Sequence, residues 1–162
     1  MKPIILLDID GVLNPAAGPG EGGDRPALTL TAEKIALVRR LADLGRIAWV
    51  STWPADLTAG LESQLQLEVE PLRVVMVLRP DDDDQATPKL RSVARWLVRM
   101  DALGEADWDS VVWIDDVLGA DARAWAHNHT QPVLLEKPTP DRGLAEVHVV
   151  AVEVFVTGAA GS

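Results

Sequence analysis

Two aspartates one residue apart, Asp8 and Asp10, follow directly on a short apolar run near the start of the chain. The run Ile4–Leu7 is apolar without alternation, which is typical of a strand buried on both faces. Gly11 comes next, so we expect the strand to end around Asp8 or Asp10. In open α/β sheets, ligands bind at this end of the strands. Two carboxylates so close together repel each other and lose solvation, which predicts a positive partner, usually a metal ion.

Three further groups of polar residues stand at strand ends or at the start of a helix. Ser51 and Thr52 follow the second apolar run, Asp115 and Asp116 follow the fourth, and Lys89 begins a helical pattern. Because the carboxyl ends of parallel strands meet at one edge of a sheet, we expect these groups to lie beside the first pair. An isolated aspartate in such a position is usually a helix cap or a turn residue. Four coincident groups favour a functional site instead.

Strand-like and helix-like segments alternate along the chain, which predicts βαβ units around a parallel sheet. Thr31 is expected to cap the first helix and Gly45 to end it. The tail, residues 141–158, is rich in β-branched residues, as strands are, but its place in the alternation favours a helix. We expect strands at 4–7, 46–52, 71–78, 110–114 and 132–136, and further helices at 55–67, 88–102 and 119–129.

The composition is that of an ordinary globular protein. With 162 residues, 48% apolar and 25% charged, the chain is expected to form a single domain over residues 1–162. Its net charge of −10 argues against a general nucleic-acid-binding surface, although one small pocket can still hold a nucleotide or a nucleic-acid end. We expect no signal peptide, no membrane-spanning segment and a cytoplasmic location. An oligomer is possible, and its order is left open.

Two loops of unusual composition flank the expected site. Residues 14–30 are rich in Gly and Pro, which fits either a flap over the site or a disordered connection. Residues 80–88 form an acidic loop containing the run Asp81–Asp84, which is a candidate for a second metal site. Runs of like charge are usually solvated, so we interpret this loop as a solvated segment that can border the entrance and repel anionic substrates.

The four polar groups, in this order, resemble the four motifs of the haloacid dehalogenase (HAD) superfamily of phosphohydrolases. "DIDGVLN" is similar to the first motif, "WVST" to the second, "PKLRSVARWL" to the third and "VVWIDDVLGAD" to the fourth. The resemblance implies a Rossmann-like three-layer α/β sandwich with a mainly parallel sheet. It also implies that Asp8 is the nucleophile and Asp10 the general acid and base. The metal would bind a carboxylate oxygen of Asp8 and the backbone carbonyl of Asp10.

The remaining motif residues suit the same chemistry. Asp115 and Asp116 would complete an oxygen-rich shell, which favours Mg²⁺ over Zn²⁺. A hydroxyl of Ser51 or Thr52 can donate a hydrogen bond to a phosphoryl oxygen. Lys89 supplies a positive charge against the phosphate and the nucleophile.

Two neighbouring residues have two interpretations each. Trp53 either stacks on a ring of the substrate or packs under the 14–30 loop. Asp121, five residues after Asp116, either holds Lys89 or a metal-bound water, or is a solvated helix residue.

The chain has no segment long enough to form the sizeable cap domain of many HAD enzymes, and in the resembled family an open site goes with bulky substrates or with a partner subunit as lid. We therefore predict a magnesium-dependent phosphatase that hydrolyses a phosphomonoester through an aspartyl-phosphate. A narrower resemblance, to the HAD group linked to bacterial RNA-repair-like proteins, favours a nucleotide or a nucleic-acid end over other phosphorylated small molecules. The alternatives are a receiver-like phospho-acceptor and a non-catalytic HAD-like binding module.

Overall fold

The computed structural model describes residues 2–14 and 28–160 of the chain. Its strands form an all-parallel sheet in the order β3-β2-β1-β4-β5, and helices alternate with them along the chain. The strands are β1 (Ile4–Leu7), β2 (Arg46–Trp49), β3 (Leu72–Arg73), β4 (Val111–Ile114) and β5 (Val133–Glu136). The α-helices are α1 (Ala32–Leu44), α2 (Ala55–Leu65), α3 (Leu90–Ala102), α4 (Ala120–Asn128) and α5 (Glu146–Ala160). The predicted Rossmann-like α/β fold is confirmed, and the described residues form no large cap.

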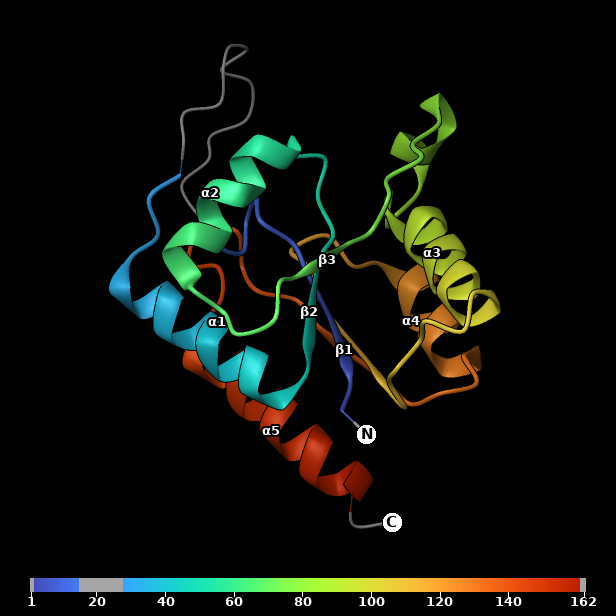
Figure 1. The fold of residues 1–162 in the computed structure, drawn as a ribbon. Helices are drawn as coiled ribbons and strands as arrows, with labels where there is room; N and C mark the ends of the chain where they lie inside the picture. Colours follow the sequence, from blue (N-terminus) through green and yellow to red (C-terminus); the bar gives the residue numbers. More distant parts are fainter. Residues whose placement is uncertain (1, 15–27, 161–162) are drawn as a thin grey trace.

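The sheet lies between two layers of helices. α1, α2 and α5 cover one face, and α3 and α4 cover the other (Figure 1). In β1, Ile5 and Leu7 pack into the core under α1, α2 and α5, while Ile4 and Leu6 pack into the core under α3 and α4. This two-sided burial explains why the first strand is apolar without alternation, as predicted.

β1 is the central strand and the point at which the chain changes direction across the sheet. It pairs with β2 on one side, where Leu7 lies opposite Trp49, and with β4 on the other, where Leu7 lies opposite Ile114. The pairing continues past the strand ends, because the Asp8 amide donates to the Ile114 carbonyl at 3.1 Å. The residues that follow β1, β2 and β4 therefore emerge side by side at one edge, where open α/β sheets bind ligands.

Several predicted elements are confirmed, and the third strand differs most in extent. Thr31 caps α1 by accepting a hydrogen bond from the Lys34 amide at 3.2 Å. The ambiguous tail is a helix, as its place in the alternation indicated. The third strand, expected at 71–78, is only two residues long. The chain leaves the sheet after Val74, and the Val77 amide binds the Ser92 hydroxyl of α3 at 3.0 Å instead of a neighbouring strand.

The acidic segment is more ordered than we predicted. Pro80–Asp84 form a 3-10 helix, and the Asp82 side chain is only 8% exposed. Asp82 accepts hydrogen bonds from the Arg79 amide at 2.6 Å and from the Arg91 guanidinium at 2.8 Å. The interpretation as a solvated run is therefore wrong for Asp82, whereas Asp81, Asp83 and Asp84 are exposed. Among the described residues, this segment also contributes no member to a metal-binding cluster.

Most of the predicted 14–30 flap lies outside the described residues, which resume at residue 28. Within the described parts of the chain, no helix combines the length and the apolar character needed to cross a bilayer.

Replacing Asp82 by Asn is expected to lower thermal stability in a pH-dependent way. Hydrogen bonds from Arg91 and from the Arg79 amide lower the pKa of Asp82 from 3.8 to about 2. Because the folded-state pKa is depressed, the stabilisation is fully present above pH 3.8 and is lost as the pH falls through about 2. The difference in melting temperature between wild type and Asp82→Asn should therefore be largest above pH 5 and close towards pH 2, when measured by circular dichroism. Asp84→Asn, in the same turn but exposed, should show little difference at any pH.

Candidate active site

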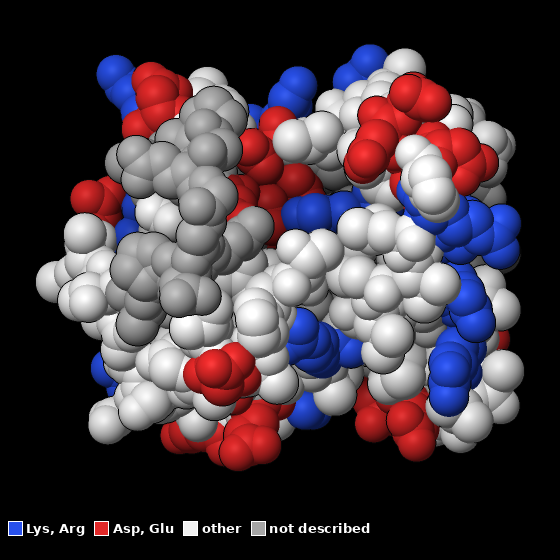
Figure 2. Space-filling model, turned by 90° about the horizontal axis from the view of Figure 1, so that it is seen from above, with Lys and Arg blue, Asp and Glu red and all other residues white. Residues whose placement is uncertain are grey.

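A pocket of about 300 Å³ opens at the carboxyl ends of β1, β2 and β4. Seen from above, acidic side chains gather near the middle of this face with a basic group beside them (Figure 2). A larger cavity of about 600 Å³ lies at the opposite edge of the sheet, near the amino ends of β1 and β2, and is lined by Lys2 and Arg46 among others. The cluster of three carboxylates does not lie there. The smaller pocket is the candidate site, and it is lined by Asp8, Asp10, Gly11, Ser51, Thr52, Lys89, Asp116, Val117 and Pro140.

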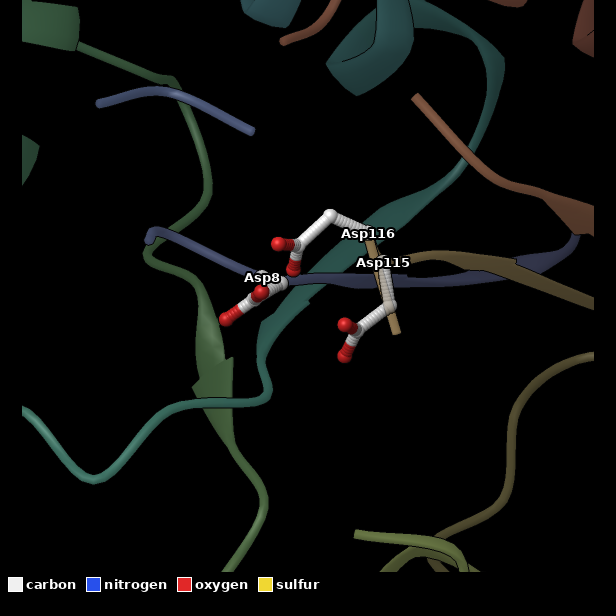
Figure 3. Close-up of side chains that lie close together, drawn as sticks. All are labelled: Asp8, Asp115 and Asp116. Carbon is white, nitrogen blue, oxygen red and sulfur yellow. The ribbon is translucent and has the colours of Figure 1, made fainter. Parts of the chain in front are cut away.

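Three carboxylates from the ends of β1 and β4 meet at this pocket. Oxygens of Asp8, Asp115 and Asp116 lie within 4.8 Å of one another. The close-up in Figure 3 shows the three side chains close together. Asp8 is 2% exposed and Asp115 is 1% exposed. Gly11 makes room for the cluster: its φ is +77°, and a Cβ atom there would lie 2.2 Å from an oxygen of Asp116. The predicted convergence of the first and fourth groups is therefore present in the structure.

Lys89 reaches into this cluster from the start of α3. Its ammonium donates to Asp8 Oδ1 at 2.6 Å, to the Val50 carbonyl at 3.1 Å and to Asp115 Oδ2 at 3.3 Å. Burial lowers the pKa of Lys89, but the charges of Asp115 and Asp8 outweigh this effect and raise it overall. The ammonium therefore stays charged at neutral pH.

The buried carboxylates are not neutralised by Lys89 alone. Burial raises the pKa of Asp8 well above its usual value, and the Asp115 charge adds to this effect against the opposing charge of Lys89. Burial likewise raises the pKa of Asp115, again against Lys89. One ammonium and three carboxylates leave a local excess of negative charge. The donor set consists of carboxylate oxygens, so these residues fit a hard divalent cation such as Mg²⁺.

Asp10 lines the pocket, is half-buried and is held by Trp53. The Trp53 ring is 2% exposed, and its Nε1 donates to Asp10 Oδ2 at 3.0 Å. Ile9, between the two aspartates, is 0% exposed and belongs to the core that includes Trp53. Of our two interpretations of Trp53, stacking on a ring of the substrate does not fit this burial, because the ring lies in the core and its indole nitrogen binds Asp10. Packing under the 14–30 loop falls mostly outside the described residues.

Ser51 and Thr52 both line the pocket, at the end of β2. Ser51 is buried and accepts a hydrogen bond from the Trp53 amide at 3.0 Å, whereas Thr52 is exposed. A hydroxyl that accepts one hydrogen bond can still donate its own proton, so Ser51 remains able to bind a phosphoryl oxygen.

One of our interpretations required Asp121 to bind Lys89, but the structure shows other partners for this carboxylate. Its carboxylate accepts hydrogen bonds from the Thr87 hydroxyl at 2.6 Å, the Thr87 amide at 3.0 Å and the Ala122 amide at 2.8 Å. Burial raises the pKa of Asp121, but the hydrogen bonds from Thr87 and the helix backbone lower it overall. The carboxylate is thus an ionised anchor for the segment that precedes Lys89.

Our sequence analysis missed Thr87 and Pro140. Thr87 is buried at 1% exposure and does not lie at a strand end, so no pattern in the sequence distinguishes it. Pro140 follows β5, and the end of this strand lies at the same edge as the others. The predicted parallel order was therefore sufficient to include the segment after β5 among the candidates.

A family model described as "HAD domain in Swiss Army Knife RNA repair proteins" matches residues 4–149. No curated protein and no solved structure matches the chain.

Proposed function

The chain belongs to the family of HAD domains in Swiss Army Knife RNA repair proteins, and from this premise we propose that it is a magnesium-dependent phosphatase acting through Asp8. Membership supports a HAD-type hydrolase in general. The observation that supports the specific reaction is the contact between Lys89 Nζ and Asp8 Oδ1 at 2.6 Å, beside two further carboxylates. A buried carboxylate held by an ammonium at a ligand-binding edge is suited to nucleophilic attack on an electron-poor phosphorus.

In the first step, a carboxylate oxygen of Asp8 attacks the phosphorus, and the bond to the ester oxygen breaks. Asp10 gives its proton to the departing oxygen, and an alcohol and an aspartyl-phosphate result. The indole of Trp53, which donates to Asp10 Oδ2, would hold the Asp10 carboxyl in the pocket during this transfer. Lys89 and a hydroxyl of Ser51 stabilise the negative charge on the transferring phosphoryl oxygens.

In the second step, Asp10, now ionised, removes a proton from water. The water oxygen attacks the phosphorus, the bond to the Asp8 oxygen breaks, and inorganic phosphate leaves. Both aspartates thereby return to their starting states. Asp8, Asp115 and Asp116 would hold the magnesium ion, which supplies positive charge beside the phosphoryl group when bound.

We propose a phosphate at a nucleic-acid end, or on a nucleotide, as the substrate. The described residues place no cap over the pocket, so a phosphate on a bulky molecule can approach it. The pocket, at about 300 Å³, is at the lower end of the range for small-molecule sites, so we expect most of a bulky substrate to lie outside it. The description of the family as a domain of RNA repair proteins supports the same substrate class.

Phosphate release should be measured from an oligoribonucleotide with a terminal 3′-phosphate, one with a 5′-phosphate, a nucleoside monophosphate and an aryl phosphate. We expect turnover with Mg²⁺ that is lost with EDTA, and faster turnover of an oligonucleotide end than of the aryl phosphate. With the aryl phosphate, whose leaving group needs little protonation, the Asp10→Asn variant should accumulate a hydroxylamine-sensitive phosphoprotein, because the acyl phosphate still forms but is not hydrolysed. A long-lived phosphoprotein in the wild type, without turnover, would support the receiver-like alternative. The absence of both a phosphoprotein and turnover would support the alternative of a non-catalytic binding module.

A further inference from the structure

Thr87 is a buried polar residue outside the pocket, and its hydroxyl joins two loops. It is 1% exposed and lies two residues before Lys89. The hydroxyl donates to Asp121 Oδ1 at 2.6 Å and accepts from the Gly119 amide at 2.7 Å. The Thr87 amide donates to Asp121 Oδ2 at 3.0 Å. Both the hydroxyl and the amide are therefore paired, and the three bonds together fix the orientation of this residue.

These bonds tie the segment that carries Lys89 to the segment that carries Asp115 and Asp116. Gly119 caps the start of α4 and Asp121 lies in its first turn, a few residues after the acidic pair. The two segments touch closely, because a Cβ atom on Gly119 would lie 2.4 Å from the Cβ of Ala86. The Leu90 amide donates to the Thr87 carbonyl at 3.0 Å, so the first turn around Lys89 is built directly on Thr87.

The position of the Lys89 ammonium depends on the position of the backbone at residue 89, from which the side chain extends. Lysine has a flexible four-carbon chain, so the side chain alone does not fix the charge in space. In the structure the ammonium contacts Asp8 at 2.6 Å but Asp115 at 3.3 Å, which is an asymmetric placement close to the nucleophile. A backbone shift at residue 89 would change both distances together.

We propose that Thr87 is a positioning residue that holds Lys89 against Asp8 by anchoring its loop to Asp121 and Gly119. The role in turnover rests on the proposed phosphatase function, but the positioning itself does not. Misplacement of a catalytic group by about 1 Å from a remote change can reduce the rate on the order of 100-fold. Replacing Thr87 by Val removes the hydroxyl and keeps the shape, so we expect a loss of that order in kcat and a smaller change in KM.

Three variants separate positioning from simple destabilisation. Thr87→Ser keeps the hydroxyl and should restore most of kcat. In a Lys89→Met background, adding Thr87→Val should cause no further loss of kcat, although it should lower the melting temperature in either background. Ser110→Ala removes a buried hydroxyl at the opposite edge, before β4, and should affect stability without affecting kcat. Equal losses of kcat from Thr87→Val in both backgrounds, or no loss in the wild type, would overturn the role in turnover.

The positioning can be measured without any substrate. A lysine ammonium held by three acceptors exchanges its protons slowly, so Lys89 should give a ¹H–¹⁵N correlation that is absent from Lys89→Met. We expect this signal in the wild type and in Thr87→Ser, and its loss in Thr87→Val. An unchanged signal in Thr87→Val, or no such signal in the wild type, would refute the proposal. If the Lys89 signal behaves as expected in all three proteins but the wild type shows no phosphatase turnover, the positioning role stands and the proposed function is refuted.

Discussion

Replacing Asp8 by Asn is expected to abolish phosphatase turnover and to leave the protein at least as stable as the wild type. An amide is not a nucleophile towards phosphorus, and removal of a nucleophile that forms a covalent intermediate typically costs at least ~10⁴-fold in kcat. Asn can retain the contacts of Asp8 Oδ1, which accepts from the Ile9 amide at 2.8 Å and from Lys89. It also removes a negative charge from a position that is only 2% exposed.

This variant should therefore lose activity without losing stability. Without a divalent cation, the melting temperature of Asp8→Asn at pH 7 should equal or exceed that of the wild type. Added Mg²⁺ should raise the wild-type value more, since the variant has lost one of three carboxylates in the proposed metal site. Asp101→Asn, an exposed substitution at the end of α3, serves as the control and should change neither property. Turnover by Asp8→Asn at the wild-type rate would exclude Asp8 as the nucleophile.

Replacing Lys89 by Met should reduce both activity and stability. Met fills a similar volume, but the ammonium that contacts Asp8 and Asp115 is gone, so two buried carboxylates lose their partner. Breaking a buried ion pair in this way costs about 3–5 kcal/mol. At roughly 2–4 °C per kcal/mol for a chain of this size, we expect the melting temperature to fall by roughly 10 °C. The loss of one charged stabiliser of the phosphoryl group should lower kcat by roughly 10²–10³-fold.

The comparison with Arg40→Met tests whether this effect is specific to the site. Arg40 bridges Glu146 and Glu153 between α1 and α5, but its side chain is 38% exposed. Exposed ion pairs contribute about 0–1 kcal/mol, so this variant should show a small change in melting temperature and an unchanged kcat. Melting temperatures from circular dichroism and rates of phosphate release, measured on both variants, test whether the effect is specific to the site. A Lys89→Met protein as stable as Arg40→Met would contradict the ion-pair geometry described above.

The sequence was most informative where one physical pattern determines the structure. Apolar residues on both faces predicted β1, because each face packs against a separate core. The parallel alternation then predicted that residues far apart in the chain, such as Asp8, Lys89 and Asp115, meet at one edge. The resemblance of their order to the HAD motifs is confirmed by the match over residues 4–149.

The details that escaped prediction depend on single contacts between distant segments. β3 is short because the Val77 amide binds the Ser92 side chain, which no strand pattern encodes. Trp53 packs in the core, and its indole nitrogen binds Asp10 on another segment, a partner that the sequence does not indicate. Thr87 binds Asp121 across 34 positions of the chain. Each of these contacts joins residues that only the folded chain brings together, so the sequence alone does not reveal it.

The burial of Ile9 between the two aspartates has a consequence for how this family can diversify. Because Ile9 is a core residue, an insertion or deletion there would disturb the core as well as the spacing of Asp8 and Asp10. Selection for a folded chain would therefore purge such changes even in a lineage that no longer used the chemistry. Exposed positions around the pocket, such as Thr52 and Pro140, carry no comparable burden. Changes at the rim can thus alter the substrate while the spacing of Asp8 and Asp10 is kept.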